Sequence, residues 1–200
     1  MLFIVLEGID GAGTTTQTRL LVEHLCRSGR TAIATAEPTD GEFGLLIRRI
    51  LRGEVSARSE AEMALLFALD RLEHCRLVIG PSVRAGKIVV CDRYYLSSLA
   101  YQALEAEMRW VREVNRAARV PDLTILIDID PRVSLKRKTG QAERYERAEL
   151  LDRVRANYFR AAEMLKEEGE RIEVLDGTLS VEQVQERIRS LCGFGLDRRR

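Results

Sequence analysis

Short runs of apolar residues alternate along the chain with longer segments in which apolar residues recur every three or four positions. Five runs are nearly continuous and resemble the strands of a parallel sheet that is buried on both faces. They comprise residues 2–6, 31–36, 87–91, 123–129 and 172–175. The segments between them have the period of amphipathic helices. This alternation predicts an α/β fold, a parallel five-stranded sheet flanked by helices.

Capping and stop signals set the bounds of the expected helices. The first begins after a glycine-rich turn and ends near Gly29, and others are expected at 45–51, 97–105, 109–118, 147–168 and 181–191. Ser59 and Glu62 form a capping box that opens a helix expected to run to Arg84 despite Gly80 and Pro81. Pro131 is expected at the start of a helix that residues 139–141 interrupt. We expect residues 1–200 to form a single domain.

The glycine-rich turn lies between the first strand and the first helix, which is the context that a phosphate-binding loop requires. Its glycines let backbone N–H groups point inward, and the following helix start adds partial positive charge. Thr15 stands where the motif G-x-x-x-x-G-K-[ST] places its Mg²⁺-binding hydroxyl, but Thr14 stands in place of the lysine. The expected phosphate-binding residues of the loop are Gly8, Ile9, Asp10, Gly11, Ala12, Gly13, Thr14, Thr15 and Thr16.

Charged residues follow three of the expected strands. Asp10, Glu37, Asp92 and Arg93 each come just after one of them. Ligands of parallel α/β sheets bind beyond the carboxyl ends of the strands. We therefore expect these four side chains to meet in one crevice.

Composition removes several classes of function. The chain has 200 residues, 46% of them hydrophobic, and a net charge of +1, which favours neither nucleic acid nor a membrane surface as partner. Its four cysteines have no metal-ligand spacing, and no run has the length of a membrane span. Met1 leads directly into a strand without a basic leader, so we expect a cytoplasmic protein.

Six segments, in this order, resemble the thymidylate kinase (dTMP kinase) family of P-loop nucleoside monophosphate kinases. They are residues 7–13, 37–39, 65–71, 90–94, 97–102 and 121–124. The resemblance covers nearly the whole chain. It implies transfer of the γ-phosphoryl group of ATP to dTMP, giving dTDP, with Mg²⁺ as the cofactor and a homodimer packed through the helix around 63–72.

The resemblance also assigns roles to residues. Phe67 would stack on thymine, Arg71 would reach the base or the phosphate, and Arg93 would hold the dTMP phosphate. Taken alone, Phe67 is more typical of core packing, and Arg93 could instead pair with Asp92. Tyr158 could face the base or pack in the core. The full dTMP-binding set is Asp10, Glu37, Pro38, Phe67, Arg71, Arg93, Ser98, Tyr101 and Gln102.

Catalysis would depend on Asp10, Arg93 and an arginine from a lid. Residues 136–147 resemble the family lid, in which Arg144 is the expected catalytic arginine and Arg137 a further phosphate ligand. Thr15 would bind Mg²⁺ directly and Asp92 through water.

Two departures from the family pattern leave alternatives open. Ala36 stands where many members have arginine, and Thr14 removes a phosphate-binding cation that Arg19, Lys136 or Arg137 could replace. One alternative function is a kinase of another pyrimidine monophosphate, UMP or CMP, against which Tyr101 beside the sugar argues. The other is a nucleotide-binding regulatory protein that lost catalysis with its lysine.

Overall fold

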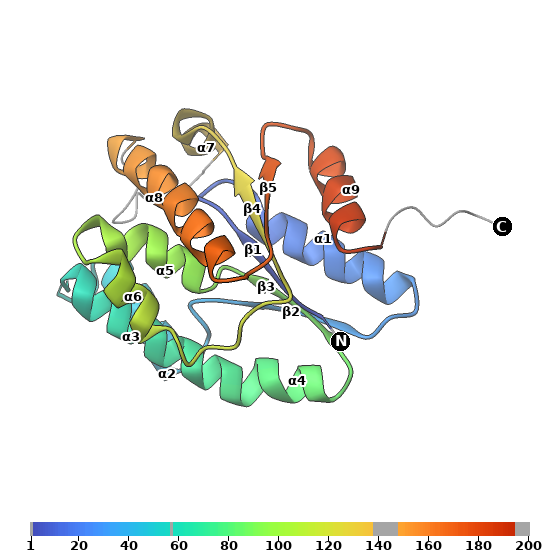
Figure 1. Cartoon of the computed structure of the whole chain (residues 1–200), viewed down its shortest axis with the longest axis horizontal. Coiled ribbons are helices and arrows are strands. Elements are labelled where there is room, and N and C mark those ends of the chain that lie inside the picture. The colour runs from blue at the N-terminus through green and yellow to red at the C-terminus, as the bar shows by residue number, and fades with distance from the viewer. Residues whose placement is uncertain (1, 57, 138–147, 195–200) are drawn as a thin grey trace.

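A parallel five-stranded sheet forms the centre of the molecule, as the hydrophobic pattern predicts (Figure 1). The computed structural model describes residues 2–56, 58–137 and 148–194. The strands lie in the order β2-β3-β1-β4-β5. Their bounds are β1 Phe3–Glu7, β2 Ala32–Ala36, β3 Ile88–Asp92, β4 Leu123–Asp128 and β5 Ile172–Asp176.

The strand register sets the position of the site. Asp92 of β3 is opposite both Leu6 of β1 and Ala36 of β2, so these three strands end at the same edge of the sheet. The segments that follow β1 and β2 contain Asp10 and Glu37. The register therefore brings these carboxylates to the edge where Asp92 lies.

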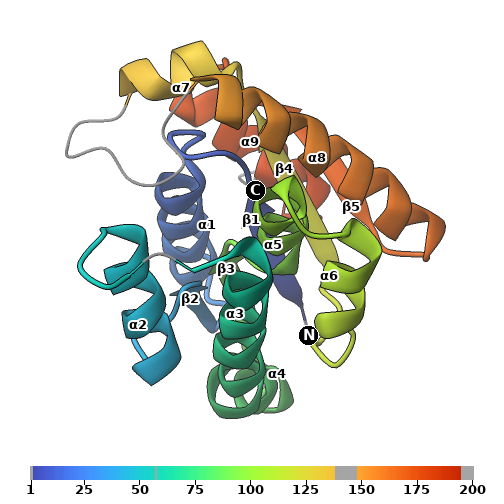
Figure 2. The same ribbon diagram turned by 90° about the vertical axis from the view of Figure 1, so that its left-hand side faces the viewer.

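Helices cover both faces of the sheet (Figures 1 and 2). On one face, α1 (Thr14–Arg27) packs on β1, β2 and β3, and α9 (Val181–Leu191) packs beside it. The opposite face carries α4 (Gly80–Arg84), α5 (Tyr95–Tyr101) and α8 (Ala148–Glu167). The remaining helical elements are α2 (Glu42–Leu51), α3 (Glu60–His74), η1 (Cys75–Ile79), η2 (Gln102–Leu104), α6 (Met108–Val114) and α7 (Pro131–Arg137).

The predicted helix from Ser59 to Arg84 is present, with a local change of pitch. Its capping box is formed as expected, since the Ser59 side chain accepts from Glu62 N and the Glu62 carboxylate accepts from Ser59 N. The π-helical turn η1 then joins α3 to α4 immediately before Pro81. Gly80 N donates to the carbonyl of Cys75, five residues back. A Cβ at Gly80 would lie 2.8 Å from that oxygen, so glycine permits this turn.

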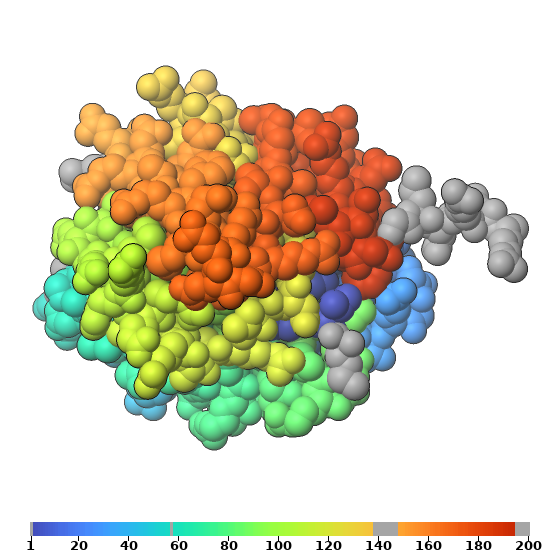
Figure 3. All heavy atoms as spheres, viewed as in Figure 1, coloured from blue at the N-terminus to red at the C-terminus, as the bar shows by residue number. Residues whose placement is uncertain are grey.

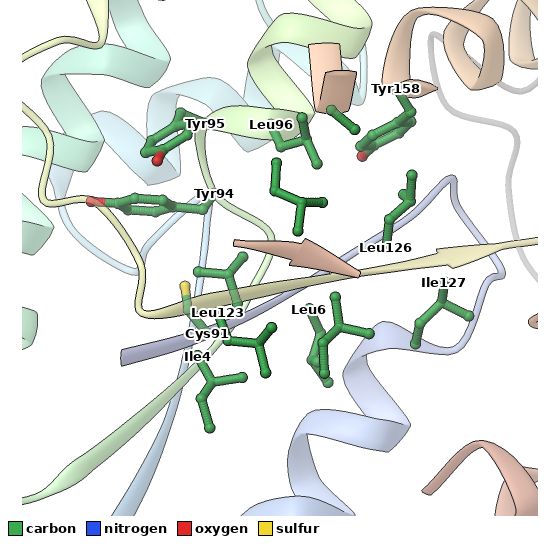
Figure 4. Packing of buried hydrophobic residues seen from close by; sticks show 14 of the residues in the cluster. Ile4, Leu6, Cys91, Tyr94, Tyr95, Leu96, Leu123, Leu126, Ile127 and Tyr158 are labelled. Atoms are coloured by element: carbon green, nitrogen blue, oxygen red, sulfur yellow. The ribbon is translucent and has the colours of Figure 1, made fainter. Parts of the chain in front are cut away.

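The core consists of the strand side chains and the helix faces packed on them (Figure 4). Phe3, Ile4 and Leu6 of β1 are completely buried, which is why this central strand has no alternation of polar residues. Tyr158 of α8, Tyr94 of the β3–α5 connection and Tyr95 of α5 cover one face of the sheet. The space-filling view shows α8 and α9 as adjacent bands of the surface (Figure 3). Within the described residues, no helix combines the length and the apolar composition needed to cross a membrane.

Candidate functional site

The glycine-rich turn has the backbone of a phosphate-binding loop. Gly11 (φ 80°) and Gly13 (φ 96°) adopt the left-handed conformation, and Gly13 is the N-cap of α1. A Cβ at Gly11 would also lie 2.6 Å from the carbonyl oxygen of Ser134. No described side chain caps α1, so N–H groups of its first turn remain available to an anion.

A cavity of about 750 Å³ opens over this loop, and we call it the donor cavity. Eight of the ten expected phosphate ligands line it: Asp10, Gly11, Ala12, Gly13, Thr14, Thr15, Thr16 and Arg137. Gly8 and Ile9 do not line it. Ile9 is buried, and a Cβ at Gly8 would lie 2.7 Å from the carbonyl oxygen of Ile127, so both residues build the turn beneath the loop.

A second cavity, of about 330 Å³, lies beyond the ends of β2 and β3, between α3 and α5, and we call it the acceptor cavity. All nine residues expected to bind dTMP line it: Asp10, Glu37, Pro38, Phe67, Arg71, Arg93, Ser98, Tyr101 and Gln102. Asp92 lines it as well, so the four charged residues that follow the strands meet in one crevice.

Three residues line both cavities: Asp10, Thr15 and Arg93. Two molecules bound in the two cavities would therefore meet at one carboxylate, one hydroxyl and one guanidinium. This arrangement suits a reaction in which a group passes from one ligand to the other.

Arg93 has an unusual backbone and a well-defined set of partners. Its φ of 67° is the one positive value among the described non-glycine residues. Its Nη2 lies 2.5 Å from Asp10 Oδ1, and its Nη1 donates to Ser97 and Tyr158, both at 3.2 Å. The partner of Arg93 is therefore Asp10 and not the adjacent Asp92. Tyr158 is buried and uses its hydroxyl at this site, so it is more than a packing residue.

Asp92 and Thr15, the two residues expected to hold Mg²⁺, are in contact with each other. The Thr15 hydroxyl donates to Asp92 Oδ2, while Asp92 Oδ1 is buried and has no hydrogen-bond partner among the described residues. A buried carboxylate oxygen without a partner, beside a hydroxyl, fits Mg²⁺, which usually takes one or two protein ligands, several waters and substrate phosphates.

Glu37 and Arg71 form a buried ion pair at the wall of the acceptor cavity. The Glu37 carboxylate lies 2.7 Å from Arg71 Nη2 and 3.0 Å from His74 Nδ1. His74 in turn contacts the Thr35 hydroxyl at 2.6 Å. On its other side, Arg71 Nη1 donates to Asn115 and to Ser98. Arg71 is thus fixed from both sides, which reduces the entropy that a ligand would lose in ordering it.

The remaining acceptor residues form a mostly apolar slot. Phe67 is half-buried and packs against the small cluster of Ile47, Ile50 and Met63, while it also lines the cavity. Tyr101 lies with its ring 5.5 Å from the Arg93 guanidinium. The Gln102 amide donates to Glu60 at 3.5 Å. Figure 2 shows α2 and α3 side by side along this part of the molecule.

The structure distinguishes among the cations that could replace the missing lysine. Arg93 and Arg137 are the cationic side chains among the described residues that line the donor cavity. Arg137 Nη1 donates to the carbonyl of Gly177 at 3.1 Å. Arg19 instead pairs with Glu23 on the exposed face of α1, and Lys136 does not line the cavity.

Part of the expected lid lies outside the described residues, and two parts of the site were not predicted from the sequence. Arg144 and most of the segment 136–147 lie outside the described residues. The sequence analysis missed the segment 177–181, which follows β5 and lines the donor cavity. The strand-end rule, applied to β5 as it was to the other strands, would have found it. It also assigned no role to Glu7, whose carboxylate contacts two hydroxyls that accept hydrogen bonds from Arg93.

The fold and the two joined cavities define a P-loop protein of the nucleoside monophosphate kinase type. Comparison with known families is more specific, because the model of the family described as thymidylate kinase matches residues 6–188. The chain belongs to the thymidylate kinase family.

Individual relatives agree with this assignment over nearly the full length. A probable thymidylate kinase of Pyrococcus abyssi is 44% identical over 198 residues, which cover 94% of this chain and 94% of that protein. One from Thermococcus onnurineus is 43% identical over 210 residues, covering 99% of this chain and all of the relative. A thymidylate kinase of Desulfotalea psychrophila is 40% identical over 158 residues, which cover 76% of this chain and 77% of that protein.

Proposed function

We propose that this protein transfers the γ-phosphoryl group of ATP to dTMP, giving dTDP. One observation carries the proposal: the donor cavity and the acceptor cavity share Asp10, Thr15 and Arg93. The names of the relatives supply the identity of the acceptor, and they favour neither a UMP/CMP kinase nor a regulatory protein.

The proposed mechanism depends on position and charge. ATP phosphates bind to the amides of the loop and to the start of α1, and the dTMP phosphate binds to Arg93. Asp10 orients the Arg93 guanidinium, so that its planar fork faces the point where the two substrates meet. No covalent intermediate and no strong general base is needed for such a transfer.

Thr15 and Asp92 are the residues that would hold Mg²⁺, Thr15 directly and Asp92 through water. When bound, Mg²⁺ neutralises charge that develops on the transferring phosphoryl group. In this chain, Thr15 presents its hydroxyl from the first turn of α1, and the buried Asp92 fixes that hydroxyl by hydrogen bonding.

The lid is proposed to complete the donor cavity. Residues 136–147 would close over ATP, with Arg144 as the catalytic arginine and Arg137 as a phosphate ligand. The position of Arg137 in the lining of the donor cavity supports its part in this proposal. Closure would exclude water, which strengthens every charge interaction inside.

In the acceptor cavity, Phe67 is proposed to stack on thymine while Arg71, Ser98 and Gln102 contact the base edge. Tyr101 is proposed to pack against the deoxyribose and to leave no room for a 2′-hydroxyl. Glu37 and Pro38 shape the wall, and Glu37 acts mainly through the fixed Arg71.

We also propose a cytoplasmic homodimer. Leu65, Leu69 and Leu72 of α3 are exposed by 48%, 46% and 38%, and their spacing places them on one face of that helix. Met63, at the start of the same stretch, is buried within the single chain and is not available to a partner. All four cysteines are free thiols, which is typical of a reducing compartment. Sedimentation of Leu65→Glu beside the wild type tests the dimer, because one charge on that face would dissociate it.

A coupled assay of ADP release tests the proposed function. With ATP and Mg²⁺, we expect the highest kcat/KM for dTMP. The kcat/KM for dUMP should be lower by an amount that corresponds to about 1–3 kcal/mol for the lost methyl group, and the values for UMP and CMP should be lower still. Preference for a ribonucleotide would support the other pyrimidine kinases. Binding of both nucleotides without any ADP release would support the regulatory protein.

A further inference from the structure

Glu7 is a buried acid that lines neither cavity. It is the last residue of β1 and is completely buried. Its Oε1 accepts hydrogen bonds from the backbone N–H groups of Tyr94, at 2.8 Å, and Ser97, at 3.2 Å. Its Oε2 accepts from the Ser97 hydroxyl at 2.5 Å and lies 3.3 Å from the Tyr158 hydroxyl.

The backbone contacts of Glu7 fix the turn that carries Arg93. Arg93 has a left-handed backbone, which side chains other than glycine rarely adopt, and such a conformation persists only where the surroundings determine it. The backbone N–H of Arg93 donates, at 2.9 Å, to the backbone carbonyl of Leu6, the residue directly before Glu7. Tyr94 and Ser97, which Glu7 binds, follow in the same turn and in the first turn of α5. The end of β1 therefore holds this turn on both sides of Arg93.

The side-chain contacts of Glu7 reach the Arg93 guanidinium itself. Ser97 and Tyr158 are the two hydroxyls that accept from Arg93 Nη1, and both lie against Glu7 Oε2. The Tyr158 hydroxyl also donates to the carbonyl of Gly8, at 3.0 Å, in the phosphate loop. One buried carboxylate thus touches both groups that direct Arg93 Nη1.

We propose that Glu7 is a positioning residue for Arg93: it holds the β3–α5 turn and, through Ser97 and Tyr158, aims the guanidinium at the place where donor and acceptor meet. This rests on the proposed function only in assigning Arg93 to the acceptor phosphate. Glu7 itself lines neither the donor cavity nor the acceptor cavity.

The charge of Glu7 depends on pH in the neutral range. Burial raises its pKa from 4.5 to about 7, against the lowering effects of Ser97 and Arg93. The other ionisable groups facing Glu7 are Arg93, Tyr158 of α8, Cys91 of β3 and Arg71 of α3. Burial raises the pKa of Cys91 and of Tyr158, so both remain neutral, and both arginines remain charged. Of these groups, Glu7 alone changes charge between pH 6 and 8.

Protonation of Glu7 alters the support of Arg93. The carboxylic acid must donate one hydrogen, so the Ser97 hydroxyl can no longer donate to the same oxygen, and a negative charge near the guanidinium is lost. Glu7→Gln reproduces this neutral form at every pH, because it keeps the size of the side chain and one carbonyl oxygen for the two backbone N–H groups.

The experiment compares the pH profiles of kcat/KM for dTMP of wild type and Glu7→Gln between pH 5.5 and 9. The second ionisation of the dTMP phosphate contributes a change near pH 6 to both. We expect the wild type to gain about tenfold more across pH 7 than the variant, with similar values at low pH and an unchanged KM for ATP. Glu163→Gln, which removes an exposed carboxylate of α8 paired with Lys166, is the matched control and should keep the wild-type profile.

Two results would overturn the proposal: a Glu7→Gln profile that coincides with that of the wild type, or equal losses toward dTMP and ATP. A second measurement needs no turnover. In the free protein, the Arg93 Nε–H resonance should shift with a midpoint near pH 7 in the wild type and not in Glu7→Gln. If dTMP is not a substrate at all, the proposed function fails, and this titration still decides the role of Glu7. Absence of this shift of the Arg93 resonance in the wild type would contradict the proposed role of Glu7.

Discussion

The Arg93 guanidinium lies 2.5 Å from the Asp10 carboxylate, and this ion pair joins the end of β3 to the phosphate loop. Arg93 also donates to Ser97 and Tyr158, so its planar fork serves three partners at once. A lysine ammonium has the charge but cannot span this geometry. We expect Arg93→Lys to lower kcat/KM for dTMP about 100-fold, which corresponds to about 2.7 kcal/mol of lost transition-state stabilisation.

The control for that measurement is Arg19→Lys, which changes an arginine exposed on α1 and paired with Glu23. It should leave the kinetics within twofold of the wild type. An Arg93→Lys enzyme with near-normal kcat/KM would show that charge without the fork is sufficient, and the assigned role of Arg93 would be wrong.

Phe67 both lines the acceptor cavity and packs against Ile47, Ile50 and Met63, so its two roles must be separated. We expect Phe67→Ala to weaken dTMP binding by about 1–3 kcal/mol while ATP binding stays nearly intact. Calorimetric titration with each nucleotide measures this. Equal weakening of both ligands would mean that Phe67 acts through the core and not on thymine.

His74 supports Arg71 through Glu37, although its ring does not line the acceptor cavity. Its removal takes one partner from a buried Glu37 oxygen and one from the part-buried Thr35 hydroxyl. We expect His74→Ala to lower the free energy of unfolding by about 1–3 kcal/mol and to raise the KM for dTMP more than it lowers kcat. Urea unfolding and steady-state kinetics measure the two effects.

Glu73→Gln is the neighbouring control, since Glu73 is half-buried and its ion pair among the described residues is with the exposed Arg76. It should leave both the free energy of unfolding and the KM for dTMP close to the wild-type values. A His74→Ala enzyme that loses stability but keeps the wild-type KM for dTMP would limit His74 to a structural role.

Local patterns and the rule that strand ends share one edge predicted the strands, the loop and the crevice of Asp10, Glu37, Asp92 and Arg93. The other residues expected in the acceptor cavity came from the family resemblance. The sequence did not predict which other side chains of the protein contact those residues. Glu37 lines the acceptor cavity as expected, but the sequence did not show that its carboxylate pairs with Arg71 and His74. Partners so far apart in the chain meet only through tertiary packing, which no local spacing encodes. Glu7 was overlooked for the same reason, since its partners Tyr94, Ser97 and Tyr158 come from elements near the middle and end of the chain.

The raised pKa of Glu7 has a consequence for stability. Its folded pKa of about 7 exceeds the unfolded value of 4.5, so the folded state binds the proton more tightly. The contribution of this group is fully present below pH 4.5 and is lost as the pH rises through 7. The loss is on the order of 3 kcal/mol.

We therefore expect Glu7→Gln to unfold at higher urea than the wild type at pH 8 and to lose this advantage near pH 5. Chemical denaturation at several pH values measures the difference, with Glu163→Gln as the reference for an exposed acid. A stability difference that does not change with pH would show that the carboxyl does not titrate in this range.

The substitution of lysine by Thr14 removes a cation from the phosphate loop, and Arg137 is the cation of α7 that lines the same cavity. A charge about 4 Å from a phosphate oxygen is worth about 4 kcal/mol at an effective dielectric near 20, so its loss without replacement would cost about 10³ in rate. We expect measurable wild-type activity that falls at least tenfold in Arg137→Ala, while Lys136→Ala, one residue earlier, stays close to the wild type.

Arg144→Ala should lower kcat by about 10³ or more with little change in ATP affinity, if Arg144 is the lid arginine. Thr14→Lys should be neutral or mildly activating in the wild type, and it should restore activity to Arg137→Ala, because either cation then serves the same phosphate. Additive, independent effects of Thr14→Lys and Arg137→Ala would show that the two positions do not replace one another, and an inactive wild type that Thr14→Lys activates would favour the regulatory protein.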